Sequence, residues 1–186
     1  YGVQMAKITK GESVLVLGTG SIAQYAIYWA RRLGAGRIVA MSRSASRADQ
    51  VRAMGADQFL PCSADEVADV QEALGGPPSV VLECVGAEGM LGKAVHHAAP
   101  FGRIVSLGFC TAPDPVIPAL ASYKCLSLHF SVGYSMREFI YIANEMDKGH
   151  CDPKASISRT IALDDLPAMM QAMRGEHGET KVHVVI

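Results

Sequence analysis

The stretch "GTGSIA", residues 18–23, combines residue types and a spacing that suit phosphate binding. It lies between the apolar run "SVLVL" and a helical apolar pattern over 20–34. Gly18 permits a tight turn, Gly20 leaves the backbone open to a pyrophosphate, and Ala23 is small enough for the helix to pack closely on the strand. The N–H groups at the start of that helix would bind the phosphate oxygens. The predicted phosphate-binding residues are Gly18, Thr19, Gly20, Ser21 and Ile22.

The second apolar run, 37–42, ends in Ser42, and Arg43 follows where a dinucleotide-binding unit usually has an acid. An acid would accept hydrogen bonds from both ribose hydroxyls and repel a 2′-phosphate. Ser42 lacks that repulsion, Arg43 can donate charge-assisted hydrogen bonds to the phosphate, and Arg47 adds positive potential. The sequence therefore predicts a preference for NADP(H) over NAD(H). The alternative, that Arg43 is a solvated loop residue or stacks on the adenine without discriminating, stays open.

Composition excludes several classes of partner. The 186 residues are 49% hydrophobic and carry a net charge of −1, so there is no electrostatic reason to expect nucleic acid or an anionic membrane. No apolar run approaches the ~20 residues of a membrane span. Five cysteines lack any C-x-x-C spacing, which predicts reduced, buried thiols in a cytoplasmic protein; they are Cys62, Cys84, Cys110, Cys125 and Cys151.

The sequence offers only weak evidence for metal ligands and catalytic groups. His96 and His97 are adjacent, about 100° apart on a helix, so they cannot chelate from one face. The run "GHCD" at 149–152 brings three ligand types together, but consecutive residues rarely close on one metal and no second cluster accompanies them. No Ser-His-Asp pattern or nucleophile elbow is present. We predict no catalytic and no metal-binding residue in this chain.

Short, nearly continuous apolar runs alternate with helical patterns at a spacing of ~20–25 residues, which is typical of a parallel sheet covered on both faces. The fold class is therefore α/β, with a doubly wound parallel sheet of six strands over residues 1–132. The regular alternation of apolar runs and helical patterns ends after residue 132. Residues 133–186 contain an amphipathic helix over 135–148, a helix with a methionine stripe, and a terminal apolar strand, "KVHVVI", whose partner we expect outside this chain. The predicted strands are 13–18, 37–42, 58–60, 79–86, 103–109 and 126–132.

The sequence as a whole resembles the cofactor-binding (Rossmann) domain of the medium-chain dehydrogenase/reductase superfamily, on its zinc-type alcohol dehydrogenase branch. The resemblance rests on "KGESVLVLGTGSIAQYAIYWARRLGA", "VRAMGADQFL", "VLECVGAEGMLGKAVHHAAPFGRIVSLGF" and "ISRTIALDDLPAMMQAM". It implies that the ends of the fourth, fifth and sixth strands line the cofactor cleft and the nicotinamide site. The residues implied there are Cys84, Val85, Gly86, Leu107, Gly108, Phe109 and Phe130.

The same resemblance implies zinc only in a catalytic domain absent from this chain, and it makes 133–186 the segment that returns toward that domain. The activity implied is hydride transfer between NADP(H) and a small alcohol or carbonyl substrate. It also implies a homodimer or homotetramer, in which the strand near 126–132 pairs edge to edge.

Three alternatives stay beside that reading. They are a zinc-free quinone or enoyl reductase of the same superfamily, a non-catalytic nucleotide-binding module, and a transferase that uses S-adenosylmethionine. The last is disfavoured because Leu17 and Ser42 stand where it would need acids.

Overall fold

The computed structural model describes residues 1–175 and 177–186, which form two compact units, Tyr1–Ser135 and Met136–Ile186. The first contains one parallel sheet and the second a small two-stranded sheet. Each unit is described by itself.

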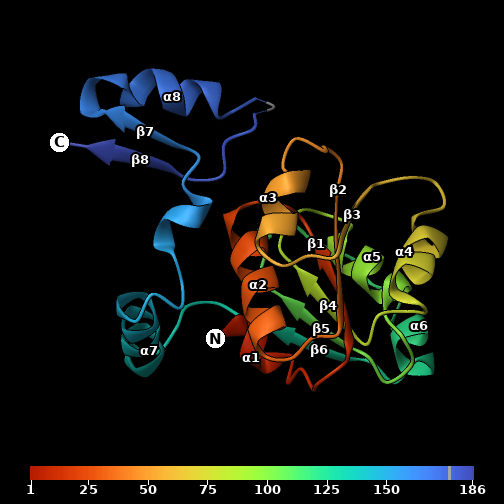
Figure 1. The fold of residues 1–186 in the computed structure, drawn as a ribbon. Helices are drawn as coiled ribbons and strands as arrows, with labels where there is room; N and C mark the ends of the chain where they lie inside the picture. The colour runs from red at the N-terminus through yellow and green to blue at the C-terminus, as the bar shows by residue number, and fades with distance from the viewer. Residues whose placement is uncertain (176) are drawn as a thin grey trace. The chain divides into compact units, whose positions relative to one another are not determined.

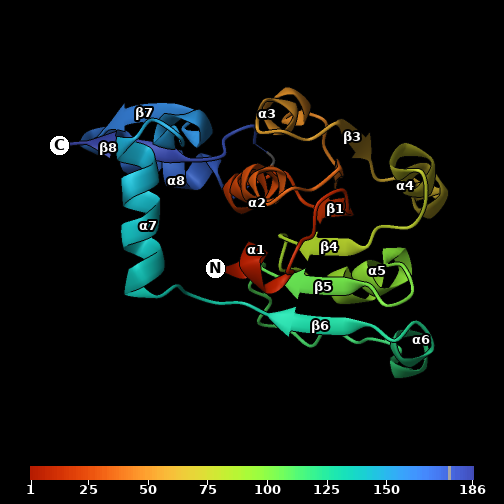
Figure 2. The ribbon, with the colours of Figure 1, turned by 60° about the horizontal axis from the view of Figure 1, so that its bottom comes forward.

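The first unit is built on a six-stranded parallel sheet with the order β3-β2-β1-β4-β5-β6. This confirms the predicted doubly wound fold. β6 lies at a free edge of the sheet (Figure 2). The strands are β1 (Ser13–Leu17), β2 (Arg37–Ser42), β3 (Gln58–Pro61), β4 (Val80–Glu83), β5 (Arg103–Ser106) and β6 (Ser127–Phe130).

Helices cover both faces of this sheet (Figure 1). They are α1 (Gly2–Met5), α2 (Ser21–Arg32), α3 (Ala48–Ala53), α4 (Glu66–Leu74), α5 (Met90–His97) and α6 (Pro118–Tyr123). Because side chains alternate along a strand, Val14 and Val16 of β1 pack with α2 and α3, and Leu15 and Leu17 pack with α4 and α5. Both faces of β1 are thus buried, which explains why its sequence is continuously apolar.

The helical apolar pattern over 20–34 is only partly buried. Ile22 and Leu33, two apolar residues of that range, are exposed, while the polar Gln24 is fully buried. The contact face of α2 combines Ile27 with the small side chains of Ala26 and Ala30, and the alanines let the helix lie close to the sheet. The short helices α1 and α6 were not predicted.

The second unit contains α7 (Met136–Asp147), β7 (Arg159–Ala162), α8 (Leu166–Ala172) and β8 (Val182–Val185), with short 3₁₀ turns at Pro153–Ser156 and Leu163–Asp165. The expectation that the terminal strand finds no partner in this chain was wrong. β8 pairs in parallel with β7 over four residue pairs, from Arg159↔Val182 to Ala162↔Val185. The methionine stripe of α8 is not core within the described residues, since none of its side chains is buried.

None of the five cysteines forms a disulfide, but their predicted burial holds only for Cys151. Cys125 is exposed and the other three are half-buried. None of the helices in the described ranges has the length and hydropathy of a membrane span.

His97 should make the stability of the first unit depend on pH. Its side chain is 1% exposed, neither ring nitrogen has a hydrogen bond, and Nε2 lies 3.6 Å from Glu66 Oε1 of α4. Burial lowers the pKa of His97, and the Glu66 carboxylate offsets that only in part. The unfolded chain therefore binds more protons below about pH 6.5, and the free energy of unfolding should fall as the pH drops from 7 to 5, by at most about 1.4 kcal/mol per pH unit.

Urea unfolding at several pH values tests this expectation. His97→Gln should flatten the dependence between pH 7 and 5. His96→Gln, at the exposed neighbouring position, should leave it unchanged. Equal pH profiles for wild type and His97→Gln would show that other groups set the slope.

Candidate dinucleotide site

The residues predicted to bind a cofactor all lie at the carboxyl edge of the sheet. Gly18–Ile22 follow β1, Ser42 ends β2, and the remaining groups end or follow β2, β4, β5 and β6. The strand order reverses direction between β1 and β4, and in an open α/β sheet that reversal creates a crevice at the carboxyl ends. The predicted residues therefore surround the place where ligands of such sheets bind.

The glycine-rich turn leaves room where a phosphate would approach. Gly18 has φ +110°, donates its N–H to Met41 O at 2.7 Å, and lies so close to β4 that an added Cβ would be 3.2 Å from Val85 Cγ2. Gly20 is the N-cap of α2 and provides no side chain to the helix N-terminus. An added Cβ on Gly20 would have no atom within 4 Å. The turn thus fits a pyrophosphate at the start of α2.

Ser42 is held by a short chain of hydrogen bonds. Thr19 Oγ1 donates to Ser42 Oγ at 3.2 Å, and Ser42 Oγ donates to Ser44 O at 2.8 Å. The hydroxyl proton of Ser42 is therefore used in the hydrogen bond to the backbone oxygen of Ser44. Arg43 is exposed at the end of the same strand, and Arg47 is half-buried at the start of α3.

Gln24 braces the turn and was missed by the sequence analysis. Its Nε2 donates to Thr19 O at 3.3 Å and to Gln50 Oε1 of α3 at 3.0 Å. The side chain thus links the glycine-rich turn to the helix that follows β2. A polar residue on an otherwise apolar helix face was the available signal.

Glu83 joins the two loops that follow β4 and β5, and the sequence analysis also missed it. It is 2% exposed; Oε1 accepts from Val85 N at 2.6 Å and Gly86 N at 2.8 Å, and Oε2 accepts from Ser106 Oγ at 3.1 Å. Its backbone oxygen accepts from Leu107 N at 2.7 Å and from the next N–H at 3.0 Å. An acid at the end of an apolar strand was the only sequence signal.

The two loops meet backbone to backbone. An added Cβ on Gly108 would overlap Gly86 N, and one on Gly86, where φ is +69°, would overlap Phe109 N. Beside this contact lies a pocket of about 340 Å³, whose lining includes Phe109 and Phe130 together with Glu83, Ser106 and Gly108. Of the predicted residues, Gly108, Phe109 and Phe130 line this pocket, and Gly86 lies against Gly108 and Phe109.

Asp114 positions the loop between β5 and α6. Its Oδ1 accepts from Gly89 N at 2.7 Å and its Oδ2 from Leu91 N at 2.9 Å, at the start of α5. The carboxylate therefore ties this loop to α5 and also lines the pocket. The contact spans 25 residues of sequence to Gly89, and no local pattern indicates it.

Cys84 is not an activated nucleophile. Burial, and then the neighbouring Glu83 carboxylate, raises the pKa of its thiol above the ordinary value. A thiol with a raised pKa stays protonated at neutral pH. Cys84 can therefore line the cleft at the end of β4 without acting as a nucleophile.

Zinc, which the resemblance implies for the family, does not fit the described residues. Within residues 1–175 and 177–186, no group of three His, Cys, Asp or Glu side chains is placed to hold a metal ion. His96 is exposed and His97 is buried on α5, so the two do not converge.

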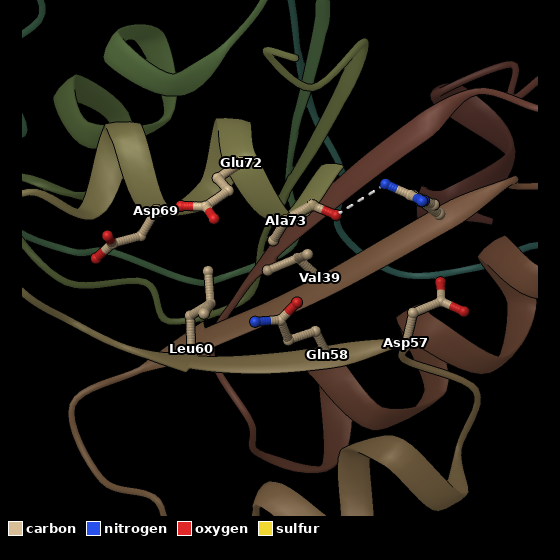
Figure 3. Close-up of a pocket in the computed structure, with 8 residues that line it drawn as sticks. Val39, Asp57, Gln58, Leu60, Asp69, Glu72 and Ala73 are labelled. Carbon is tan, nitrogen blue, oxygen red and sulfur yellow. Dashed lines mark hydrogen bonds between the residues drawn. The ribbon is translucent and has the colours of Figure 1, made fainter. Parts of the chain in front are cut away.

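A second pocket, of about 640 Å³, lies between α4 and the strands β2 and β3 (Figure 3). Its lining includes Arg37 and Gln58, the first residues of β2 and β3, and also Asp57 and Glu72. It therefore lies toward the amino ends of the strands, away from the crevice. Ligands of open α/β sheets bind at the carboxyl ends.

The sheet order and the glycine-rich turn define the first unit as a Rossmann nucleotide-binding domain. A family model described as "Zinc-binding dehydrogenase" matches residues 21–148. The chain belongs to this family, the zinc-type alcohol dehydrogenases among the medium-chain oxidoreductases.

Three similar proteins illustrate the relationship. L-threonine 3-dehydrogenase of Rhizobium etli is 30% identical over 166 residues, which is 88% of this chain and 48% of that protein. Alcohol dehydrogenase TADH from Thermus sp. ATN1 has a TM-score of 0.88 at 26% identity, and the match covers 100% of this chain and 54% of that one. A Sinorhizobium meliloti 1021 protein solved bound to NADP has a TM-score of 0.86 at 26% identity, with 100% of this chain and 55% of that one covered. The chain thus spans about half the length of the proteins it matches.

Proposed function

We propose that this chain is the cofactor-binding half of an alcohol dehydrogenase-like oxidoreductase that prefers NADP(H) and acts on a small alcohol or carbonyl substrate. The observation that carries the proposal is the open space over Gly20 at the uncapped start of α2, beside loops that follow β4 and β5. A nicotinamide cofactor, when bound, supplies or accepts the hydride.

The residues of the chain would bind and orient that cofactor. The turn from Gly18 to Ile22 would hold the pyrophosphate, with Ser42, Arg43 and Arg47 near the adenosine ribose. Similarity to a protein solved with NADP supports the cofactor class, and Arg43 supports the preference. The cleft and the nicotinamide ribose and ring would be lined by Cys84, Val85, Gly86, Leu107, Gly108 and Phe109, with Phe130 beside the carboxamide.

Thermal unfolding with added ligands tests the proposal. A ligand at 100 times its Kd stabilises the folded state by about 2.7 kcal/mol, or roughly 5–10 °C for a domain of this size. NADPH should raise the melting temperature more than NADH at equal concentration, and S-adenosylmethionine should not raise it. A reversed order of the two dinucleotides would contradict the assignment of the preference to Arg43, and stabilisation by S-adenosylmethionine alone would favour a transferase.

The whole protein's organisation follows as part of this proposal. Residues 1–132 would form the dinucleotide-binding domain, and 133–186 would return toward a catalytic domain that supplies zinc. The lack of buried apolar side chains in α8 fits a segment that packs on further protein. The exposed edge strand β6 fits pairing with a second copy. Cysteines that form no disulfide fit the cytoplasm.

A zinc-free quinone or enoyl reductase of the same superfamily would use the same cofactor half, and a nucleotide-binding module would use it without chemistry. The zinc content and turnover of the complete protein distinguish these from the leading proposal. The match to the zinc-binding dehydrogenase model favours the leading proposal, an alcohol dehydrogenase-like oxidoreductase.

A further inference from the structure

Glu83 is a buried acid in the wall of the pocket at the ends of β4, β5 and β6. Its carboxylate accepts hydrogen bonds from three neutral donors: the N–H groups of Val85 and Gly86 and the hydroxyl of Ser106. No arginine or lysine is among the described residues that line the pocket. The wall therefore contains a negative charge without a cationic partner in the lining.

The Glu83 carboxylate lies directly beside Gly108, which also lines the pocket. An added Cβ on Gly108 would lie 2.7 Å from Glu83 Oε2. Asp114 is the other charged side chain of the described pocket lining, and the N–H groups at the start of α5 offset it. The pocket as a whole is thus biased toward a cation.

We propose that the Glu83 carboxylate tunes the site toward the oxidised cofactor, whose nicotinamide ring is cationic, over the reduced cofactor, whose ring is neutral. The inference rests on the proposed function, which assigns this pocket to the nicotinamide. Charge near the ring is one of the means by which a protein adjusts a cofactor's electronics. Such an interaction is stronger in a buried site than in water.

Glu83 also acts as a positioning residue, because its side chain and backbone hold both loops. The two roles can be separated by substitution. Glu83→Gln keeps an acceptor for Val85 N and Gly86 N and can donate to Ser106 Oγ, so it removes the charge while retaining the shape. Ser106→Ala removes a hydrogen bond while retaining the charge.

Calorimetric titration of the folded 186-residue chain with NADP⁺ and NADPH provides the test, and the readout is the ratio of the two dissociation constants. In Glu83→Gln the ratio Kd(NADP⁺)/Kd(NADPH) should rise about tenfold relative to wild type, which corresponds to about 30 mV in the two-electron potential of the bound cofactor. In Ser106→Ala both constants should change by a similar factor, and the ratio should stay within about twofold.

Asp114→Asn is a second charge removal that leaves Glu83 in place. It should move the ratio in the same direction by a smaller factor, about twofold, because Asp114 is more exposed and already offset by α5. It also keeps the inference testable if Glu83→Gln does not fold.

The outcomes distinguish a failure of the role of Glu83 from a failure of the proposed function. Binding of both forms with a ratio that neither charge removal changes would overturn the role of Glu83 and leave the proposed function intact. No binding of either form to wild type would overturn the proposed function and this inference with it. A Ser106→Ala ratio that shifts as far as that of Glu83→Gln would reduce Glu83 to a positioning residue alone.

Discussion

The double substitution Ser42→Asp, Arg43→Ala is expected to reverse the cofactor preference. Loss of the charge-assisted hydrogen bonds of Arg43 removes about 1.5–3 kcal/mol from NADPH binding, and the carboxylate introduced at position 42 adds repulsion of the 2′-phosphate. The ratio Kd(NADPH)/Kd(NADH) should therefore rise about 100-fold in titrations of the two dinucleotides. Thr19 Oγ1, which donates to Ser42 Oγ in the wild type, is placed to donate to the new carboxylate.

Single substitutions show which of the two residues causes the change in the Kd ratio. Because the Ser42 hydroxyl donates to Ser44 O, it has no proton left for a 2′-phosphate, so Ser42→Ala should change the ratio little and Arg43→Ala should change it most. Arg52→Ala is the matched control, since it removes an exposed positive charge of α3 that pairs with Asp49. An unchanged ratio in the double variant would show that other residues distinguish NADPH from NADH at the adenosine ribose.

Gly108→Ala is expected to weaken cofactor binding. The new Cβ would overlap Gly86 N, so the loops after β4 and β5 would have to separate. Overpacking of this kind costs about 1–3 kcal/mol, and the same displacement at the cofactor site should weaken binding of both dinucleotides by at least about tenfold. Titration calorimetry and thermal unfolding measure the two effects separately.

Gly92→Ala is the control for this change. Gly92 lies in α5 near the same loops, but its added Cβ would meet only Pro115 O, at 3.5 Å, an ordinary contact. Alanine in a helix is favoured over glycine by about 1 kcal/mol, so this variant should be slightly more stable and bind normally. Normal binding by Gly108→Ala would mean that the contact between the loops does not shape the site.

The sheet was predictable because the burial of each strand can be inferred from that strand's own sequence. Val14–Leu17 are apolar without interruption since both faces of β1 are covered, and the glycine-rich turn follows directly. The second unit was harder. Its strands β7 and β8 lie about 20 residues apart in sequence, and nothing local indicates that they pair with each other.

The supporting residues of the site were not predictable for the same reason. Glu83 and Asp114 act through contacts with residues on other elements, 23 residues away for Ser106 and 25 for Gly89. Gln24 is buried because α2 packs there against the turn and α3, not because of any sequence period. Local patterns predicted which loops form the site, and tertiary contacts determine what holds them.

An amide NMR titration of the chain with NADPH tests whether a dinucleotide binds at the carboxyl edge of the sheet. Saturable shifts should be centred on Gly18–Ile22, on Ser42 and Arg43, and on the loops at Gly86 and Gly108. Saturable shifts confined to the pocket around Arg37 and Glu72, or none at all, would contradict it.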